Sequence, residues 1–596
     1  LTALESVKKT IGDLEKSFPD GLAWKVTYDP TAFVTATIHE VQKTLIEAFA
    51  LVVLVVYIFL GNLRATLIPT VAVPVSLVGA FIVLNAIGYS ANTVSLLAVV
   101  LAIGIVVDDA IVVIENVERV MEEHPELSPA EATKRAMGEI VAPIIAITLV
   151  LLSVFVPVAF IPGISGELFR QFAVTVAVAM VLSAINALTL SPALCAILLK
   201  PHHGPRRGPI GLIMRGIDWT RDRYGNGVAR LVRISAISLV LTAAFGAGIY
   251  AMSRVTPTGF LPEDDQGAFF VVAQLPDGAS IGRTSALAAE VEGILKTEKA
   301  IADYSTVIGL NFIDNYSQPN AGFFVVTLKP FDQRTSPEDS ASAVIARLAQ
   351  KFRSVRDGNV VPVAPPPIIG LGSGGGFSYV LMDMGSSDAK ALGQALRGLT
   401  VAANQDPQLR RVFSTFSDSA PSIYLDIDRE KVQILGVALS DVFQALQASL
   451  GGYYVNDMNL FGRTWQVQVQ AEGTDRASVN DIYRINVRSK SGDMVPLRSF
   501  VEAKVVVGPQ ALIRYNNRLA VTLQGSPAPG VSSGQALKAM EAVAAKTLSP
   551  GYRGEWTDVS FQEKRAEGQT GIILAFALLF AYLFLGGPES FAVSNY

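Results

Sequence analysis

The stretch LAVVLAIGIVVDDAIVVIENVERV, residues 97–120, carries two adjacent aspartates in a run that is otherwise apolar as far as Ile114. Such a run predicts a membrane-spanning helix, because about 20 helical residues cross a bilayer core of roughly 30 Å. Each aspartate near the middle of the helix costs about 2.5–3.5 kcal/mol on an insertion scale. The pair Asp108 and Asp109 therefore indicates a functional group. The alternative is a structural role, in which neighbouring Ser, Thr and Asn side chains form hydrogen bonds with the two carboxylates.

Two adjacent carboxylates in a low-dielectric environment disfavour double ionisation, so we expect at least one to bind a proton unless a cation is close. Such a pair titrates as one coupled unit. No Lys or Arg lies well inside the first six predicted spans, and Lys43 lies only at the end of one. The residues therefore predict a proton-binding pair whose cationic partner comes from outside this chain.

The composition supports membrane insertion, since 50% of the 596 residues are hydrophobic and only 17% are charged. A net charge of −4 gives no basic field for nucleic acid, and the single Cys195 excludes a disulfide framework. The four histidines form no zinc-ligand pattern with cysteine. Apolar segments suited to membrane spans lie near residues 43–61, 66–87, 92–114, 140–161, 171–199, 234–253 and 571–586.

The loop between the fifth and sixth predicted spans sets the orientation. Residues 200–233 contain eight Lys and Arg residues against Asp218 and Asp222. Short loops rich in Lys and Arg stay in the cytoplasm, so this loop and a helix predicted at 116–137 are assigned to that side. The polar region from about 255 to 568 is then expected on the opposite side of the membrane.

That polar region shows alternating strand and helix patterns rather than a linker. The first unit is predicted as strand 268–276, helix 280–297, strands 303–310 and 323–330, helix 336–353 and strand 359–365. This β-α-β-β-α-β order is that of the split ferredoxin-like fold. A second unit is predicted from strand 377–384, helix 387–404, strand 422–428 and helix 533–547, with an insertion at about 450–510. Glycine-rich residues 370–378 are predicted to join the units, and PEDDQG at 262–267 to form a solvated turn.

A short internal repeat relates the two ends of the chain. PDGLAWKVTYD at 19–29 precedes a span ending in VYIFLGN at 56–62, and SPGYRGEWTD at 549–558 precedes one ending in AYLFLGG at 581–587. This pattern predicts a parallel tandem repeat with a large external insertion, a known transporter design. We expect the chain to hold a little over one period, cut at both ends.

Five separated motifs carry a resemblance to a known family. They read AIGIVVDDAIVVIENVERVM, FLGNLRATLIPTVAVPVSL, LTLSPALCAILLKP, GFLPEDDQGAFFVVAQLPDGAS and LGGYYVNDMNLFGR. Together the chain resembles the resistance-nodulation-division transporters of the hydrophobe/amphiphile efflux subgroup. The resemblance implies a homotrimeric, twelve-helix proton/drug antiporter of the bacterial inner membrane that works with a periplasmic adaptor protein and an outer-membrane channel. It implies no cofactor, because the proton gradient supplies the energy.

The resemblance also implies a domain organisation. Residues 1–38 would end the first periplasmic porter loop, and residues 39–199 would hold transmembrane helices two to six. A cytoplasmic amphipathic connector would follow at 200–232, and transmembrane helices seven and eight would lie at 233–254 and 569–587. Between these two helices, one porter subdomain would occupy 255–376, the second would occupy 377–450 with 511–568, and a docking insertion would occupy 451–510. Residues 361–377 would line a substrate-access cleft with a mobile loop, with a plain linker as the alternative.

Site residues follow from the same resemblance. Asp108 and Asp109 match the proton-relay pair of the fourth helix, and the lysine that completes the relay belongs to helices absent from this chain. Residues 307–326 match the loop between the proximal and distal drug pockets and the strand that follows it, where aromatic side chains accept many ligands. We expect Phe312, Phe323, Leu310 and Tyr316 to line this site. Ordinary sheet packing is the alternative for each.

Three other functions compete with drug export. A heavy-metal exporter would need soft ligands, yet only Met382 and Met384 lie close together among ten methionines. A protein-export or lipid-handling membrane protein could use the same proton pair. An enzyme is disfavoured, because the Gly-rich 370–376 lacks the Lys-Ser/Thr of a phosphate-binding loop and four histidines suggest no catalytic triad.

Overall fold

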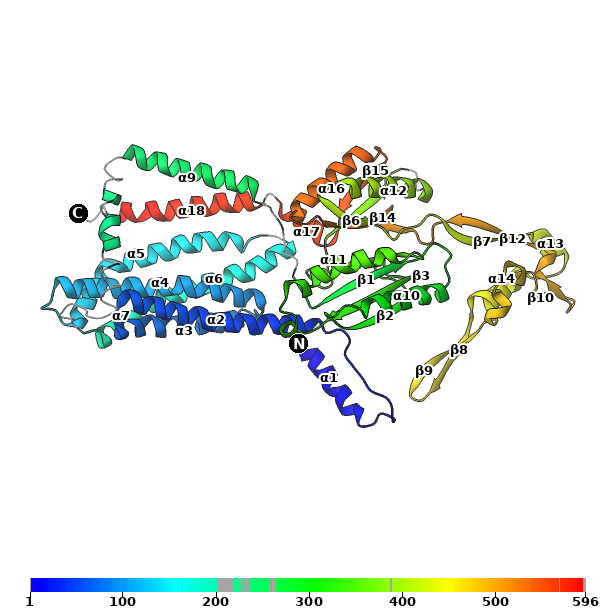
Figure 1. The fold of residues 1–596 in the computed structure, drawn as a ribbon, viewed down its shortest axis with the longest axis horizontal. Coiled ribbons are helices and arrows are strands. Elements are labelled where there is room, and N and C mark those ends of the chain that lie inside the picture. Colours follow the sequence, from blue (N-terminus) through cyan, green and yellow to red (C-terminus); the bar gives the residue numbers. More distant parts are fainter. Residues whose placement is uncertain are drawn as a thin grey trace.

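A bundle of long helices lies at one end of the molecule, two α/β units lie beside it, and a two-stranded hairpin extends at the far end (Figure 1). This computed structural model describes residues 2–161, 163–200, 216, 219–225, 227–229, 235–256, 259, 264–385, 388–567 and 569–592. The predicted connector at 200–232 lies largely outside the described residues.

The helices of the bundle begin and end at strong local signals. Gly61 ends the first long helix in the left-handed region, with φ of 58°, and the Asn62 side chain caps the next. Asn92 and Ser95 form a capping box before the helix that carries the aspartates. The helices are α2 (Pro30–Leu60), α3 (Leu63–Ala86), α4 (Thr93–Glu123), α5 (Pro129–Val158), α6 (Gly163–Leu188) and α7 (Leu190–Leu198). A separate helix α1 (Thr2–Glu15) precedes them.

Every predicted span coincides with helix. Within the described residues, five segments are long and apolar enough to cross a membrane, namely α2, α3, α4, α5 and residues 166–198. The other two predicted spans fall on α9 (Ser235–Val255) and α18 (Gln569–Ala592), whose apolar stretches are shorter. Thr189 separates α6 from α7, so the fifth predicted span is interrupted near its end.

The predicted helix at 116–137 is wrong. α4 continues without a break to Glu123, and Ser128 starts α5 with a capping box to Glu131. Ser128 followed by Pro129 is a strong helix-start signal. The charged residues at 116–137 are therefore the ends of two spanning helices joined by a short turn.

The first α/β unit is a four-stranded antiparallel sheet covered on one face by two helices. Its elements are β1 (Ala268–Gln274), α10 (Ile281–Leu295), β2 (Ile301–Asn311), β3 (Tyr316–Leu328), α11 (Ala341–Lys351) and β4 (Asn359–Val363). The strand order is β2-β3-β1-β4. α11 begins later than predicted, because Pro337–Asp339 form a separate 3-10 turn and Ser340 caps the helix.

Alternate residues of β1 and β3 point to opposite faces of this sheet. Phe269 and Phe324 are fully buried in the core shared with the helices. Phe270 and Phe323 belong to a second apolar cluster, on the other face. The element order is the predicted one, and it separates a helix-covered core from a face available for other contacts.

The second unit is built around a five-stranded sheet. Its elements are β5 (Phe377–Asp383), α12 (Ala389–Gln405), β6 (Leu409–Phe413), β13 (Ile513–Tyr515), β14 (Arg518–Pro527), α16 (Ser533–Thr547) and β15 (Tyr552–Trp556). The order is β13-β14-β5-β15, and β6 also pairs with β14. The sequence patterns missed β6, where Arg410 and Arg411 interrupt the apolar signal. α17 (Asp558–Ala566) then connects this unit to α18.

The predicted strand at 422–428 does not belong to this sheet. It is β7 (Ala420–Ile427), which pairs with β12 (Val501–Gly508) over its whole length. A separate core lies beside this ribbon and includes Val432 and Leu497. The insertion therefore begins by Ala420 and not at 451. The predicted boundary was wrong because a period-two pattern predicts a strand but does not indicate which strand it pairs with.

The rest of the insertion contains a long hairpin. The elements of this part of the insertion are α13 (Arg429–Ile434), α14 (Leu439–Leu446), β8 (Tyr453–Leu460), β9 (Arg463–Val469), β10 (Asn486–Arg488) and β11 (Met494–Pro496). β8 and β9 pair only with each other, and every residue from 454 to 470 is exposed. The hairpin thus extends away from the α/β units as a free ribbon (Figure 1).

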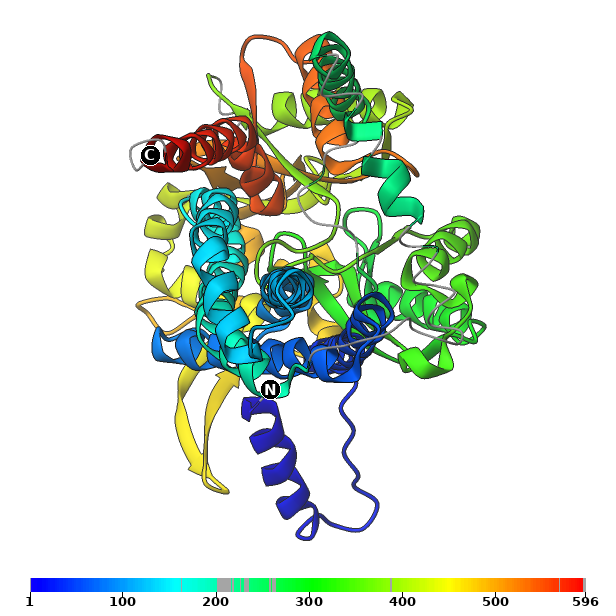
Figure 2. The ribbon, with the colours of Figure 1, turned by 90° about the vertical axis from the view of Figure 1, so that its left-hand side faces the viewer.

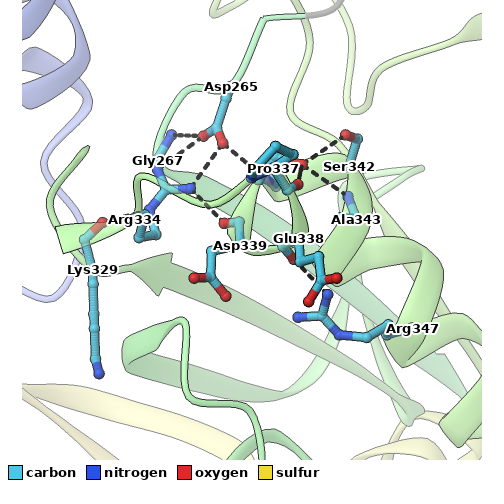
Figure 3. A network of polar contacts seen from close by, with 12 residues as sticks. Asp265, Gly267, Lys329, Arg334, Pro337, Glu338, Asp339, Ser342, Ala343 and Arg347 are labelled. Carbon is cyan, nitrogen blue, oxygen red and sulfur yellow. Dashed lines mark hydrogen bonds and ion pairs between the residues drawn. The ribbon is translucent and has the colours of Figure 1, made fainter. Parts of the chain in front are cut away.

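A buried ion pair fixes the start of the first unit (Figure 3). The Arg334 guanidinium, 2% exposed, donates to both carboxylate oxygens of Asp265, at 2.8 and 3.2 Å. It also donates to the carbonyls of Lys329 and Asp339. Asp265 in turn accepts from the backbone N–H of Ala341, the first residue of α11. The predicted solvated turn is therefore wrong for Asp265, which ties β1 to α11.

Candidate functional site

The two aspartates lie on α4, which packs against α2, α3, α5, α6 and α7. Small and branched side chains such as Ala102 and Val113 are fully buried along the helix and allow this close packing. Consecutive helical residues point about 100° apart. Asp109 is consequently half-buried against α6, whereas Asp108 is exposed on another side of α4.

Asp109 has a specific partner within the bundle. The Ser183 hydroxyl of α6 lies 2.6 Å from Asp109 Oδ2 and 3.0 Å from the Val106 carbonyl oxygen. Ser183 is itself 3% exposed, so its hydroxyl is available to these two acceptors and not to solvent. Among the described residues neither aspartate has an ion-pair partner. This hydrogen bond holds Asp109 in place without neutralising its charge.

Sequence reasoning missed Ser183 and the polar contact one turn away. Asn186 Nδ2 donates to Ser76 Oγ of α3 at 2.8 Å. Both Ser183 and Asn186 lie on α6, in a segment selected for its apolar character. Ser183 and Asn186 are three residues apart, so both side chains project from one face of a helix. This spacing of polar residues within a predicted span could have indicated a polar contact inside the bundle.

Three of the four predicted pocket residues meet on the free face of the first sheet. The rings of Phe312 and Phe323 stack with centroids 4.0 Å apart and planes 12° apart. Phe270, which the sequence reasoning missed, lies 5.5 Å from Phe312 and 5.3 Å from Phe323. Leu310 packs against the same cluster. Side chains alternate along β1, so Phe270 points to the free face of the sheet because Phe269 points to the helices.

Tyr316 lies outside this aromatic cluster. It stands at the start of β3 and pairs across the hairpin with Asn311. Burial is the main cause that raises the pKa of the Tyr316 hydroxyl, and the nearby carboxylates of Asp314 and Asp277 add to it. The structure therefore places Tyr316 in a polar environment next to the cluster.

A polar network ties the loop between β2 and β3 to the second unit. Asp314 accepts a hydrogen bond from the Thr415 hydroxyl, and Asn311 Nδ2 lies 3.3 Å from the same carboxylate. Asn311 also donates to Gln318, which donates to Gln510 at 2.9 Å. Phe312 thus lies between Asn311 and Asp314, two members of a network that reaches Thr415 and Gln510 outside its own sheet.

The glycine-rich segment at 370–376 is also anchored. Ser373 Oγ donates to the Ile313 carbonyl at 3.1 Å, and the Gly375 amide donates to the Ala364 carbonyl at 2.7 Å. A Cβ on Gly376 would come within 2.1 Å of the Gly525 carbonyl oxygen, and its φ of 91° already disfavours a side chain. The segment lies against both units and contacts the loop that carries Phe312.

Burial raises the pKa of Asp314, although its hydrogen bonds from Thr415 and Asn311 oppose the change. A carboxyl with a raised folded pKa adds stability only below its unfolded pKa, and that contribution is lost as the pH rises through the raised value. We therefore expect Asp314→Asn to raise the apparent melting temperature at neutral pH, with the gain vanishing as the pH falls to about 4.

Thermal unfolding of the purified protein across this pH range measures the effect. Asp332→Asn, at an exposed position of the same unit, is the matched control and should be neutral throughout. A shift for Asp314→Asn that is the same at every pH would contradict the electrostatic account.

Comparisons with known proteins place this geometry in a family. Residues 1–588 match the AcrB/AcrD/AcrF family. The multidrug export protein AcrF of Escherichia coli (strain K12) is 42% identical over 98% of this chain and 57% of its own length. The multidrug/solvent efflux pump membrane transporter MepB of Pseudomonas putida is 39% identical over 98% of this chain and 56% of its own length. The multidrug resistance protein MdtF of Escherichia coli (strain K12) is 37% identical with similar coverage.

The chain thus spans somewhat more than half the length of these curated relatives. The match covers both the helical bundle and the α/β units, and it therefore includes α4 with its two aspartates and the sheet with its aromatic cluster. The chain belongs to the AcrB/AcrD/AcrF family of resistance-nodulation-division transporters, as its motifs indicated.

Proposed function

We propose that the complete protein exports hydrophobic and amphiphilic compounds from the periplasm and inner membrane in exchange for protons. The observation that carries this proposal is the carboxylate pair Asp108 and Asp109 inside an apolar helix packed at the centre of the bundle. Binding and release of a proton at such a pair changes the charge within the membrane, which can drive a conformational step. The proton gradient would supply the energy without a cofactor.

The β-rich part would carry the substrate site. The cluster of Phe270, Phe312 and Phe323 offers flat apolar surfaces without fixed hydrogen-bond geometry, which suits chemically varied ligands. Relatives of the chain are named as multidrug or multidrug/solvent exporters. These two observations favour drug export over the metal-export, protein-export and lipid-handling alternatives, and favour a transporter over an enzyme.

The same proposal includes the assembly. The two α/β units would be periplasmic porter subdomains, the first with the ferredoxin-like strand order, and the chain would form one part of a twelve-helix tandem repeat. The complete protein would be a homotrimer that works with a periplasmic adaptor and an outer-membrane channel. The exposed β8–β9 hairpin supports a docking role for the insertion, since a free ribbon needs a partner surface.

Expression of the complete gene in an efflux-deficient bacterium tests the function. We expect increased resistance to amphiphilic drugs, and loss of dye efflux when a protonophore collapses the proton gradient. Resistance to metal ions alone, or efflux that survives the protonophore, would contradict the proposal.

Truncation of one stacked ring should change substrate selectivity. We expect Phe312→Ala to alter resistance to some drugs several-fold more than to others, because each ligand uses the stacked surface to a different extent. Phe443→Ala, which removes an exposed ring from α14, is the matched control. Susceptibility to a panel of drugs measures the change, and a uniform loss for all drugs would indicate a packing role instead.

A further inference from the structure

An apolar groove of about 700 Å³ runs along the seam between α5 and α18. These two helices pack side by side, and Figure 2 shows α18, in red, next to the cyan helices of the bundle. The lining residues are Leu149, Leu152, Ser153, Val156, Pro157, Phe160, Ile161, Ile573, Phe576, Phe580 and Phe584. The hydroxyl of Ser153, the one polar side chain among them, already donates to the Val150 carbonyl. The groove therefore presents a largely apolar surface.

The lining residues repeat at helical spacing, so one face of each helix forms one wall of the groove. From Ile573 to Phe584 the groove extends about 16 Å at 1.5 Å per residue. This length is about half of a hydrocarbon core of roughly 30 Å, the depth of a single leaflet.

Two arginines lie near the end of the groove that is nearest the α/β units. Phe160 and Ile161 lie there, two or three residues before Gly163, and a Cβ on Gly163 would lie 3.9 Å from Arg565 Nε and 3.6 Å from Gln562 Oε1. Arg565 is exposed, and no other described residue forms an ion pair with it. Arg170 also lies at this end, where it donates to the Ala159 carbonyl and pairs with Glu167 at 3.2 Å. Arg565 is thus a guanidinium near the end of the groove that has no ion-pair partner among the described residues.

We propose that this groove binds an anionic phospholipid of the leaflet next to the α/β units, with one acyl chain along α5 and α18 and the phosphate at Arg565. An apolar cleft one leaflet deep, with the Arg565 guanidinium and the Gln562 amide near its end, matches the two parts of such a lipid. The inference rests only on membrane insertion of α5 and α18, and it is independent of drug transport.

Photolabelling of the complete protein in lipid nanodiscs tests the site. The probe is phosphatidylglycerol with a diazirine at the end of one acyl chain, and mass spectrometry locates the adducts. We expect adducts on residues 573–584, and about five-fold less labelling by this probe in Arg565→Gln. Diacylglycerol with the same diazirine chain lacks the phosphate, so it should label weakly and equally in both proteins.

A second pair of variants tests the groove itself. Val156→Trp fills the groove and should remove most of the adducts, whereas Val154→Trp, similarly exposed on α5 but outside the lining, should leave them unchanged. Arg553→Gln, an exposed arginine of β15, is the control for charge. Equal labelling by the two probes, equal labelling of the two tryptophan variants, or no adducts because another protein segment covers the seam would each overturn the proposal. Drug resistance, measured separately, distinguishes this failure from failure of the transport proposal.

Discussion

Asp108→Asn and Asp109→Asn, each introduced into the complete protein, are expected to abolish drug resistance while leaving expression and assembly intact. Asparagine has nearly the same shape as aspartate but cannot bind and release a proton. At position 109 it can still accept the hydrogen bond from Ser183, so the packing of α4 against α6 should survive. The loss should therefore be one of energy coupling and not of folding.

Drug susceptibility together with proton uptake in proteoliposomes measures this loss. Glu122→Gln, which neutralises an exposed acid near the end of the same helix, is the matched control and should transport normally. Undiminished resistance in both aspartate variants would refute the proton-relay assignment.

The second large effect concerns the Asp265–Arg334 pair. Arg334→Met should destabilise the first α/β unit by about 3 kcal/mol, the lower end of the range for breaking a buried ion pair, because Asp265 is 28% exposed. Burial opposes ionisation of Asp265. The hydrogen bonds from Arg334 and from the Ala341 and Gly267 amides nevertheless hold its pKa below the usual range. Removal of the guanidinium leaves this carboxylate without its main partner.

Limited proteolysis and thermal unfolding of the purified protein measure the destabilisation. Arg553→Met, at an exposed ion pair, should change stability by less than about 1 kcal/mol. Adding Asp265→Asn to Arg334→Met should recover part of the loss, because the second change removes the stranded charge. A double variant as unstable as the sum of both single variants would show that the two side chains act independently.

The lowered pKa of Asp265 also fixes how this stability depends on pH. A carboxyl with a depressed folded pKa contributes stability above its unfolded value, and that contribution is lost as the pH falls through the depressed value. The ion pair should therefore persist below about pH 4, where most exposed carboxylates are already protonated.

The sequence predicted the features that depend on local pattern. Apolar length located the five described segments that are long enough to cross a membrane, whereas the other two predicted spans fall on α9 and α18, whose apolar stretches are shorter. The two aspartates within α4 were informative because charged residues are rare in such segments. The family resemblance, and not strand alternation, predicted Phe312 and Phe323; Phe323 lies on β3, and Phe312 directly follows the end of β2. The match of residues 1–588 to one family confirms the identification made from separated motifs.

The sequence could not predict which distant segments meet. Ser183 lies 74 residues from Asp109, and Arg334 lies 69 residues from Asp265, so no local periodicity connects them. The strand β7 looked like its neighbours, yet it pairs with β12 and begins the insertion early. Exposure of Asp108 beside a half-buried Asp109 likewise depends on helix packing, which the order of residues alone does not specify.

The free β8–β9 ribbon has a consequence for the life of the protein in the cell. An isolated two-stranded hairpin is only marginally stable in water, and its unpaired edges are templates for strand addition. Copies of the chain whose ribbon stays uncovered should be cut by proteases first, at the exposed turn around Phe461 and Gly462. Cleavage at this turn would therefore mark copies whose hairpin is not covered by a partner surface, and degradation of such copies would need no separate recognition signal.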